Sequence, residues 1–469
     1  MIRGPDARPW RFDLQLDVST SVPRRTQLAR ALVREIQRGR LLPGAFLPGT
    51  RPLAAQLGVN RKVVVAAFDE LIAQGWLEAL PQRGVRVAAH LPRSAVGDAQ
   101  PTVKETVRGA ARTRISDGTP DARIAPLDAL ARAQRRALRS LARTGQLDYG
   151  DPAGDPRLRE VLASFVSQAR GLSARAEQIV LTRGSQGALS LFALATLKPG
   201  DVVAVEDPGY TPAWRALSLT GAKIAHVSVD GHGLDTARLE ALAKKLRGRL
   251  KAVYVTPHHQ YPTTVSLSPE RRMHLQRICQ QHDVCLVEDD YDYEYHFDGT
   301  PLLPLCATPA SPRYVYIASL SKLLAPAVRL GYAIASPSIV EALRATRAVL
   351  DRQGDVVLER AVAELIEDGE LQRHARRARL LYVKRRDHLL KRLGSTKLGC
   401  ECPSGGLALW VRSAVRIETL VARAEARGLV LQPGSAHLHA GRLDAFRFGF
   451  AGHTPEELTA ICRTLERCL

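Results

Sequence analysis

The sequence predicts two bodies: a small helix-rich unit that ends in a β-hairpin, and a larger α/β unit with a mostly parallel sheet. Apolar residues recur at helical spacing before residue 75, and a hairpin signal follows them. From residue 116 onward, short runs rich in Val, Ile and Tyr alternate with helical stretches, which is typical of a sheet covered by helices on both faces. A chain of 469 residues has room for two or three domains.

The composition is that of an ordinary globular protein, with 45% hydrophobic and 24% charged residues. No stretch approaches the roughly 20 uncharged apolar residues of a membrane helix. The N-terminus lacks the apolar core of a secretory signal, so we expect a cytoplasmic protein with no membrane partner. Cys400 and Cys402 are the only close pair among seven cysteines, so we expect reduced thiols and no metal site.

Positive charge is concentrated at the start of the chain, which carries a formal net charge of +20. Residues 1–90 hold 14 Lys or Arg against 7 Asp or Glu, and residues 91–115 hold 5 against 2. A basic terminal module is typical of proteins that bind a polyanion such as DNA. An Arg-rich composition throughout the chain explains the charge as well, so charge alone does not decide between the two.

The first unit, residues 24–90, reads as three helices followed by a hairpin. Apolar residues at helical spacing mark the first helix, and residues 52–57 form a short second one. Gly58 breaks that helix, and Asn60 is a good N-cap for a third helix over 61–73. Two strands, 76–80 and 85–88, then flank the turn Pro81-Gln82-Arg83-Gly84.

This order is that of a winged helix-turn-helix, whose second helix after the turn enters the major groove of DNA. The segment LPGTRPLAAQLGVNRKVVVAAFDELIAQGWLEALPQRGVRV resembles the DNA-binding domain of GntR-type regulators nearly from end to end. The resemblance implies DNA contacts from Arg51, Arg61 and the wing-tip Gly84. Additional candidates for phosphate contacts are Lys62, Arg83 and Arg86.

Residues 91–115 contain Pro, Ser, Gly and alternating charge without apolar periodicity, which predicts a flexible linker. So long a linker favours two separate bodies, with the second unit over 116–469. Six strands are predicted there, at 179–182, 202–206, 252–256, 284–288, 314–318 and 331–335. Helical stretches between several of them, such as 187–197 and 269–282, predict a right-handed doubly wound domain.

A polar cluster follows each of five predicted strands. The clusters are Gly184-Ser185-Gln186, Asp207-Pro208-Gly209-Tyr210, Pro257-His258-His259-Gln260, Asp289-Asp290-Tyr291 and Ser319-Leu320-Ser321-Lys322. In open α/β sheets ligands lie outside the carboxyl ends of the strands. The sequence therefore predicts a ligand site at this edge.

The residues in these clusters match what pyridoxal 5′-phosphate requires: a lysine, a carboxylate for the pyridine nitrogen, phosphate donors and an aromatic ring. Lys322 is the candidate for the Schiff base, Asp289 for the pyridine nitrogen and Tyr210 for ring stacking. Tyr291 is expected to donate to the phenolic oxygen of the cofactor. Phosphate ligands are expected from the helix start at Gly184, Ser185 and Gln186 and from Ser319, Ser321 and Arg329.

The order of these residues resembles type I aminotransferases of the aspartate aminotransferase fold. The expected fold class is thus a winged helix-turn-helix plus a PLP-dependent transferase type I domain. Arg447, in Phe-Arg-Phe-Gly-Phe, matches the arginine with which that family binds a carboxylate. Tyr149, in LDYGDPAG, matches a tyrosine that reaches the phosphate of the other subunit, although the segment is equally typical of a simple turn.

A GntR-type winged helix, a linker and an aminotransferase-like domain in one chain are together similar to the MocR family of bacterial transcription regulators. The motifs DYGDPAGDPRLREVLASFV, VEDPGY, EDDYDYEY and SLSKLLAPAVRLGY look like that family. The resemblance implies a homodimeric regulator that binds pyridoxal phosphate and a DNA operator. Some such regulators also sense an amino compound, and they usually lack turnover.

The chain departs from the family pattern after the third strand. Thr264 stands where the family commonly has Gly, although β-branched residues dislike a positive φ. Tyr261 stands where aminotransferases have Asn, which makes efficient transamination less expected. His258 and His259 have no metal-ligand partner at a useful spacing, so we expect them to line the pocket or lie on the surface.

Two functions remain open at this point. The main hypothesis is a regulator whose second domain senses pyridoxal phosphate itself or an amine captured by it. The alternative is a working aminotransferase with an accessory DNA-binding domain. Lys322 supplies a general base in either case, so the sequence does not exclude the enzyme.

Overall fold

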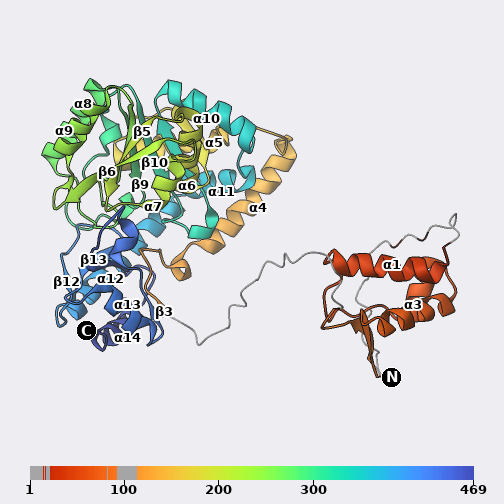
Figure 1. Ribbon diagram of the computed structural model, residues 1–469. Coiled ribbons are helices and arrows are strands. Elements are labelled where there is room, and N and C mark those ends of the chain that lie inside the picture. The colour runs from red at the N-terminus through yellow and green to blue at the C-terminus, as the bar shows by residue number, and fades with distance from the viewer. Residues whose placement is uncertain (1–13, 15, 17–21, 82, 92–112) are drawn as a thin grey trace. The chain divides into compact units, whose positions relative to one another are not determined.

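The structure is a computed structural model that describes residues 14, 16, 22–81, 83–91 and 113–469 (Figure 1). The chain divides into two compact units, Met1–Glu105 and Thr106–Leu469. Most of the predicted linker, 92–112, lies outside the described residues. Thr113–Arg114, which we counted with the linker, form strand β3 and pair with β14 (Leu429–Val430) of the second unit.

The first unit has the three helices and the hairpin that the sequence predicts. Its helices are α1 (Arg24–Gln37), α2 (Thr50–Leu57) and α3 (Arg61–Ala73), and its strands are β1 (Leu77–Leu80) and β2 (Gly84–Val87). Gly58 ends α2 in the left-handed conformation, and the side chain of Asn60 accepts a hydrogen bond from the backbone N–H of Lys62. Buried Leu32, Leu53 and Phe68 join the helices in one core.

An eight-stranded sheet forms the centre of the second unit, in the order β4-β11-β10-β9-β8-β5-β6-β7. The strands are β4 (Ile179–Thr182), β5 (Val202–Asp207), β6 (Lys223–Asp230), β7 (Gly233–Leu234), β8 (Leu250–Val255), β9 (Cys285–Asp290), β10 (Tyr314–Ser319) and β11 (Gly331–Ala335). The five strands from β10 to β6 are parallel, whereas β11 is antiparallel to both of its neighbours. The sequence pattern predicted six of these strands and missed β6 and β7.

Alternating residues of the strands pack into two separate cores. Leu181, Val253 and Leu286 face one core, and their neighbours Val180 and Ala252 face the other. The first core includes residues of α5 (Pro156–Arg170), α8 (Thr236–Leu246), α9 (Pro269–Gln281) and α11 (Val356–Glu367), and the second includes residues of α6 (Gly184–Thr196), α7 (Thr211–Leu217) and α10 (Pro337–Leu350). The sheet is therefore covered on both faces, as the near-continuous apolar strands predict.

A smaller subdomain follows the sheet, drawn in blue in Figure 1. The long helix α12 (Glu370–Leu393) leads to a three-stranded antiparallel sheet of β12 (Gly399–Cys400), β13 (Ala408–Arg412) and β15 (Ala445–Gly449). Helices α13 (Ile417–Glu425) and α14 (Pro455–Glu466) complete this subdomain, whereas α4 (Leu127–Thr144) packs against α11. All seven cysteines carry free thiols, as predicted. Among the described residues, no helix combines the length and apolar character that crossing a bilayer requires.

Candidate cofactor site and nucleic-acid interface

The polar clusters after β4, β5, β8, β9 and β10 meet at one edge of the sheet. These five strands point the same way, because β4 and β10 are both antiparallel to β11 and the rest are parallel to β10. A cavity of about 190 Å³ opens there. It is lined by Asp117, Ser185, Gln186, Tyr210, Tyr254, Thr256, Tyr261, Asp289, Tyr291, Ser319, Ser321, Lys322, Pro326, Arg329 and Arg447.

Lys322 presents its amine to this cavity from the turn after β10 (Tyr314–Ser319). Its Nζ donates a hydrogen bond to the backbone oxygen of Gly118 at 2.9 Å. Burial lowers the pKa of Lys322, and the Asp117 carboxylate partly opposes that effect. A lowered pKa increases the fraction of free amine, which is the nucleophilic form that attacks an aldehyde.

Asp289 lies at the end of β9, and only one of its two carboxylate oxygens has a hydrogen-bond partner. Its Oδ2 accepts a hydrogen bond from the Tyr254 hydroxyl at 3.0 Å, while Oδ1 is buried without a partner. Burial raises the pKa of Asp289 to about 6. A buried carboxylate oxygen without a donor is costly, so this position fits a cationic N–H donor such as a pyridinium nitrogen.

The start of α6 forms a second part of the cavity wall. Gly184 has φ +70°, and an added Cβ there would come within 3.2 Å of the Arg329 guanidinium. Arg329 itself donates to the backbone oxygen of Arg183 at 2.7 Å. The buried hydroxyl of Ser321 has no partner. Free helix N–H groups, a hydroxyl and a guanidinium are the donors that a phosphate dianion needs.

Two tyrosines line the cavity from the loops after β5 and β8. The rings of Tyr210 and Tyr261 meet edge to face, with centroids 5.1 Å apart. The Tyr261 hydroxyl donates to Oδ2 of Asp117 at 3.2 Å. Burial raises the pKa of Tyr210 to about 12, so both rings act as neutral aromatic surfaces.

Arg447, on β15, reaches the same cavity from the smaller subdomain. Its Nε donates to the backbone oxygen of Asp117 at 2.7 Å, and Nη1 donates to that of Pro262 at 2.8 Å. The guanidinium carbon lies 4.7 Å from the centroid of the Tyr261 ring. The Tyr291 hydroxyl donates to the backbone oxygen of His259 at 2.8 Å, so this proton already has an acceptor within the chain.

Tyr149 lies apart from the cavity. Its side chain is 71% exposed in the segment before α5, and the guanidinium of Arg352 stands 4.1 Å from its ring centroid. The resemblance assigned Tyr149 to the phosphate of another subunit, which stays a prediction. Sequence reasoning missed Asp117, Tyr254 and Thr256 as cavity residues. Period-two alternation along β8 could have found the last two, whereas the sequence predicted no strand before Asp117, and the short β3 (Thr113–Arg114) was counted with the linker.

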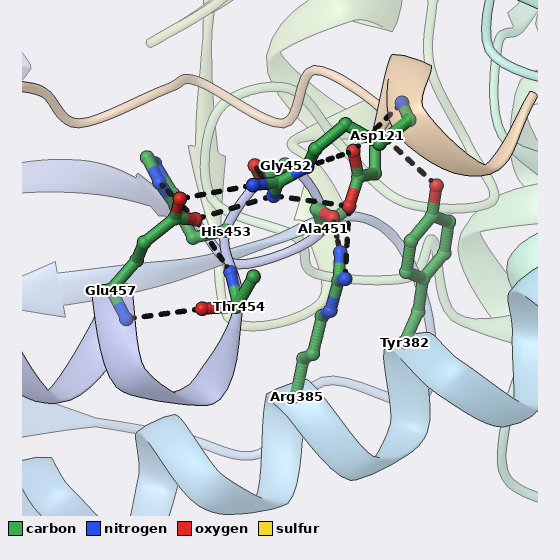
Figure 2. Close-up of polar contacts among 9 residues, drawn as sticks. Asp121, Tyr382, Arg385, Ala451, Gly452, His453, Thr454 and Glu457 are labelled. Atoms are coloured by element: carbon green, nitrogen blue, oxygen red, sulfur yellow. Dashed lines mark hydrogen bonds and ion pairs between the residues drawn. The ribbon is translucent and has the colours of Figure 1, made fainter.

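The segment after the linker passes through this site and is anchored beyond it. Asp121 accepts from Nε of Arg123 at 2.8 Å and pairs with Nη2 of Arg385 at 2.9 Å, and its backbone N–H donates to the Tyr382 hydroxyl at 3.0 Å (Figure 2). Arg123 also pairs with Glu457 of α14 at 3.0 Å. Burial alone would raise the pKa of Asp121, but the two arginines hold it below its ordinary value.

The loop after β8 contains Thr264, His258 and His259, for which the sequence predicted an unfavourable turn residue and two histidines without a metal-ligand partner. Thr264 adopts φ +66°, the strained region that the family glycine would occupy freely. His258 and His259 do have a third imidazole beside them, because the chain after β9 brings in His296. The expectation that they lack such a neighbour was wrong, since residue spacing does not reveal contacts between separate loops.

The predicted DNA-contacting side chains of the first unit are exposed. Arg61 opens α3 and its Nε donates to the Thr50 hydroxyl at 3.2 Å, and Arg51, Lys62 and Arg83 are open to solvent. Gly84 has φ +97° at the start of β2, and a Cβ there would meet nothing within 4 Å. Arg86, a further phosphate candidate, instead pairs with Glu78 at 2.6 Å, because the two face each other across the hairpin.

Comparisons with known proteins agree with this architecture. Residues 116–465 match the aminotransferase class I and II family, and residues 24–87 match the bacterial regulatory proteins of the gntR family. The chain is 30% identical over 467 residues to a probable rhizopine catabolism regulatory protein, MocR, of Rhizobium meliloti, over 95% of this chain and 93% of that protein.

A second relative is the HTH-type pyridoxine biosynthesis transcriptional regulator PdxR of Corynebacterium glutamicum, 32% identical over 94% of each chain. The second unit is similar to a crystal structure of Pyrococcus horikoshii kynurenine aminotransferase, with a TM-score of 0.70 and 26% identity. That match covers 76% of this chain and 91% of the enzyme. The predicted helix-turn-helix with a small wing and the aspartate aminotransferase-like fold are thus confirmed.

Proposed function

Because this chain belongs to the MocR-type family of helix-turn-helix transcriptional regulators with an aminotransferase-like domain, we propose that it senses pyridoxal 5′-phosphate or an amino compound captured by it. The observation that carries the proposal is the cavity in which the Lys322 amine and an unpartnered oxygen of buried Asp289 both lie. When bound, the cofactor supplies an aldehyde that combines with primary amines.

Each part of the cavity has a proposed role in holding that group. Lys322 binds the aldehyde end, and Asp289 holds the proton of the pyridine nitrogen. Tyr210 would pack against the ring, and Tyr291 would lie beside the phenolic oxygen. The phosphate donors are Gly184, Ser185, Gln186, Ser319, Ser321 and Arg329, joined by Tyr149 of the partner subunit in a homodimer.

Arg447 is the proposed anchor for the carboxylate of an amino-acid effector. Two of its N–H groups now donate to backbone oxygens of Asp117 and Pro262. A carboxylate forms stronger, charge-assisted bonds with a guanidinium than a neutral carbonyl does. An incoming carboxylate therefore competes with the backbone of Asp117 for Arg447.

This competition offers a route from the cavity to the linker. Lys322 donates a hydrogen bond to the backbone oxygen of Gly118, and Arg447 donates one to the backbone oxygen of Asp117. With the cofactor bound to Lys322, Nζ would have fewer N–H groups to donate to the backbone oxygen of Gly118. The bonds of Asp121 fix one end of this segment (Figure 2), and the pairing of Thr113–Arg114 with β14 fixes the end next to the linker. A change at Asp117 and Gly118 therefore acts on the stretch between these two anchors. A ligand changes DNA affinity only if it favours one arrangement over the other.

In the DNA-binding unit, α3 is the proposed recognition helix. Arg51 and Arg61 position the helix and read bases, Lys62 contacts phosphate, and Arg83 with Gly84 supports the wing. A homodimer carries two such units, which predicts an operator with two half-sites.

Lys322→Ala tests the cofactor assignment directly. The purified full-length variant should lose the visible absorbance that the wild type shows with pyridoxal phosphate, because the aldehyde has no amine to join. Lys245→Ala, which removes an exposed lysine of α8, should keep that absorbance. A Lys322→Ala protein with an unchanged visible band would refute the assignment.

The same spectrum separates the regulator from the alternative enzyme. Amino acids that shift the band and leave it shifted support a sensor. Conversion to the amine form of the cofactor, followed by recovery with a keto acid, would mean a working aminotransferase.

A further inference from the structure

Three histidines from two loops converge behind the wall of the cofactor cavity. His258 and His259 follow β8, and His296 follows the turn after β9. One ring nitrogen of each lies within 4.8 Å of those of the other two. His259 is 1% exposed and His258 5% exposed, while His296 is half-buried.

Each of the three rings has one buried nitrogen without a hydrogen-bond partner. Nδ1 of His259 is hydrogen-bonded to Oδ1 of Asp292 at 2.8 Å, whereas the buried Nε2 of His259 has no partner. Nε2 of His258 and Nδ1 of His296 are also buried and unpartnered. Buried polar atoms are nearly always satisfied, and one ion bound among these neighbouring rings would satisfy all three nitrogens.

The ring spacing fits a single metal ion. A tetrahedral zinc ion with Zn–N bonds of about 2.0–2.1 Å places imidazole centroids roughly 5.2 Å apart. The centroids here are 5.1 Å apart for His258 and His259, 5.6 Å for His258 and His296, and 5.7 Å for His259 and His296. Small rotations of the rings would bring the three ring nitrogens, which now lie within 4.8 Å of one another, to the closer spacing that one ion requires.

We propose that His258, His259 and His296 bind one divalent transition-metal ion, with Zn²⁺ as the preferred occupant. Three imidazoles without a carboxylate in the donor set favour Zn²⁺ or a neighbouring borderline metal over Mg²⁺ or Ca²⁺. Asp292 fixes the tautomer and orientation of His259 in the way that carboxylates support metal-bound histidines. Water takes the fourth position.

The metal joins two loops that shape the cofactor cavity. The backbone oxygen of His259 accepts a hydrogen bond from the Tyr291 hydroxyl. Tyr261, two residues after His259 in the chain, lines the cavity. His296 pairs through its backbone with Gly405, which precedes the β13 strand of the smaller subdomain. Zn²⁺ would therefore stiffen the wall of the cavity. This inference stands independently of the proposed function.

The test uses the full-length protein after removal of metal with a chelator. Co²⁺ is titrated in and its visible d–d absorption is followed, and thermal unfolding is measured with and without Zn²⁺. We expect one Co²⁺ per chain with a tetrahedral spectrum, displaced by Zn²⁺. Zn²⁺ at a hundred times its dissociation constant should shift the unfolding equilibrium about 100-fold toward the folded state.

His296→Gln, at the half-buried position, should abolish both signals while preserving the fold. The matched control, His232→Gln, removes an exposed histidine and should change neither. Cys402→Ser checks that no exposed thiol binds the ion. An octahedral Co²⁺ spectrum, no stoichiometric binding, or wild-type behaviour of His296→Gln would each overturn the proposal.

Discussion

At the scale of single residues, Asp289 links burial and charge at the proposed cofactor site. Burial raises the pKa of its carboxyl from 3.8 to about 6. A raised carboxyl pKa means that the folded protein holds this proton more tightly than the unfolded chain does. The cofactor-free protein therefore loses stability as pH rises from about 4 to 6, and the loss is complete above that range.

Asp289→Asn should remove this pH dependence, since an amide cannot ionise and still accepts the bond from Tyr254. The free energy of unfolding of the cofactor-free variant, relative to wild type, should increase from pH 4 to pH 6 by up to about 3 kcal/mol. Chemical denaturation at several pH values measures it. Asp128→Asn, at an exposed position, should run parallel to wild type. A constant difference between Asp289→Asn and wild type across this range would show that Asp289 is not the group responsible.

Residue types in strand-end clusters allowed most of the cavity to be predicted. Ten of the predicted cofactor and effector residues line it, including Lys322, Asp289 and Arg447. The place of Asp117 in the cavity could not be predicted, because Asp117 enters the site from the segment after the linker and no local sequence pattern indicates its position. The contact of His296 with His258 was missed for the same reason, since it depends on how two loops fold.

At the scale of elements, α3, the proposed recognition helix, was predictable because a capping residue marks its start. Asn60 caps α3 at the residue the sequence indicated, and the helix covers Arg61–Ala73. By contrast, β11 reads like its parallel neighbours, although it runs antiparallel to β4 and β10. Direction depends on the path of the connection, and a short apolar run does not encode it.

Arg61→Ala tests the role of α3. The variant should bind its preferred DNA more weakly by about 1–3 kcal/mol, because a base-reading arginine contributes that much. Fluorescence anisotropy with a duplex selected from a random library measures this. Arg30→Ala removes the same charge from an exposed site on α1 and should cost much less. If both variants lost the same DNA affinity, Arg61 would contribute only its positive charge and would not read bases.

At the scale of the whole molecule, the sequence predicts two bodies, and the chain does divide into two compact units. Each unit has its own core. A fragment ending near residue 90 should therefore bind DNA in a salt-dependent manner and ignore pyridoxal phosphate. Anisotropy at two salt concentrations, each with and without pyridoxal phosphate, checks both statements. A fragment that fails to bind any DNA even at low salt would contradict the winged-helix assignment.

The central claim is that occupancy of the cavity at Lys322 changes DNA affinity. The most direct measurement is the dissociation constant of the full-length protein for its selected duplex, with and without pyridoxal phosphate, in wild type and Lys322→Ala. We predict a change of at least several-fold in wild type and none in the variant. An unchanged dissociation constant in a wild-type protein that visibly carries the cofactor would contradict the claim.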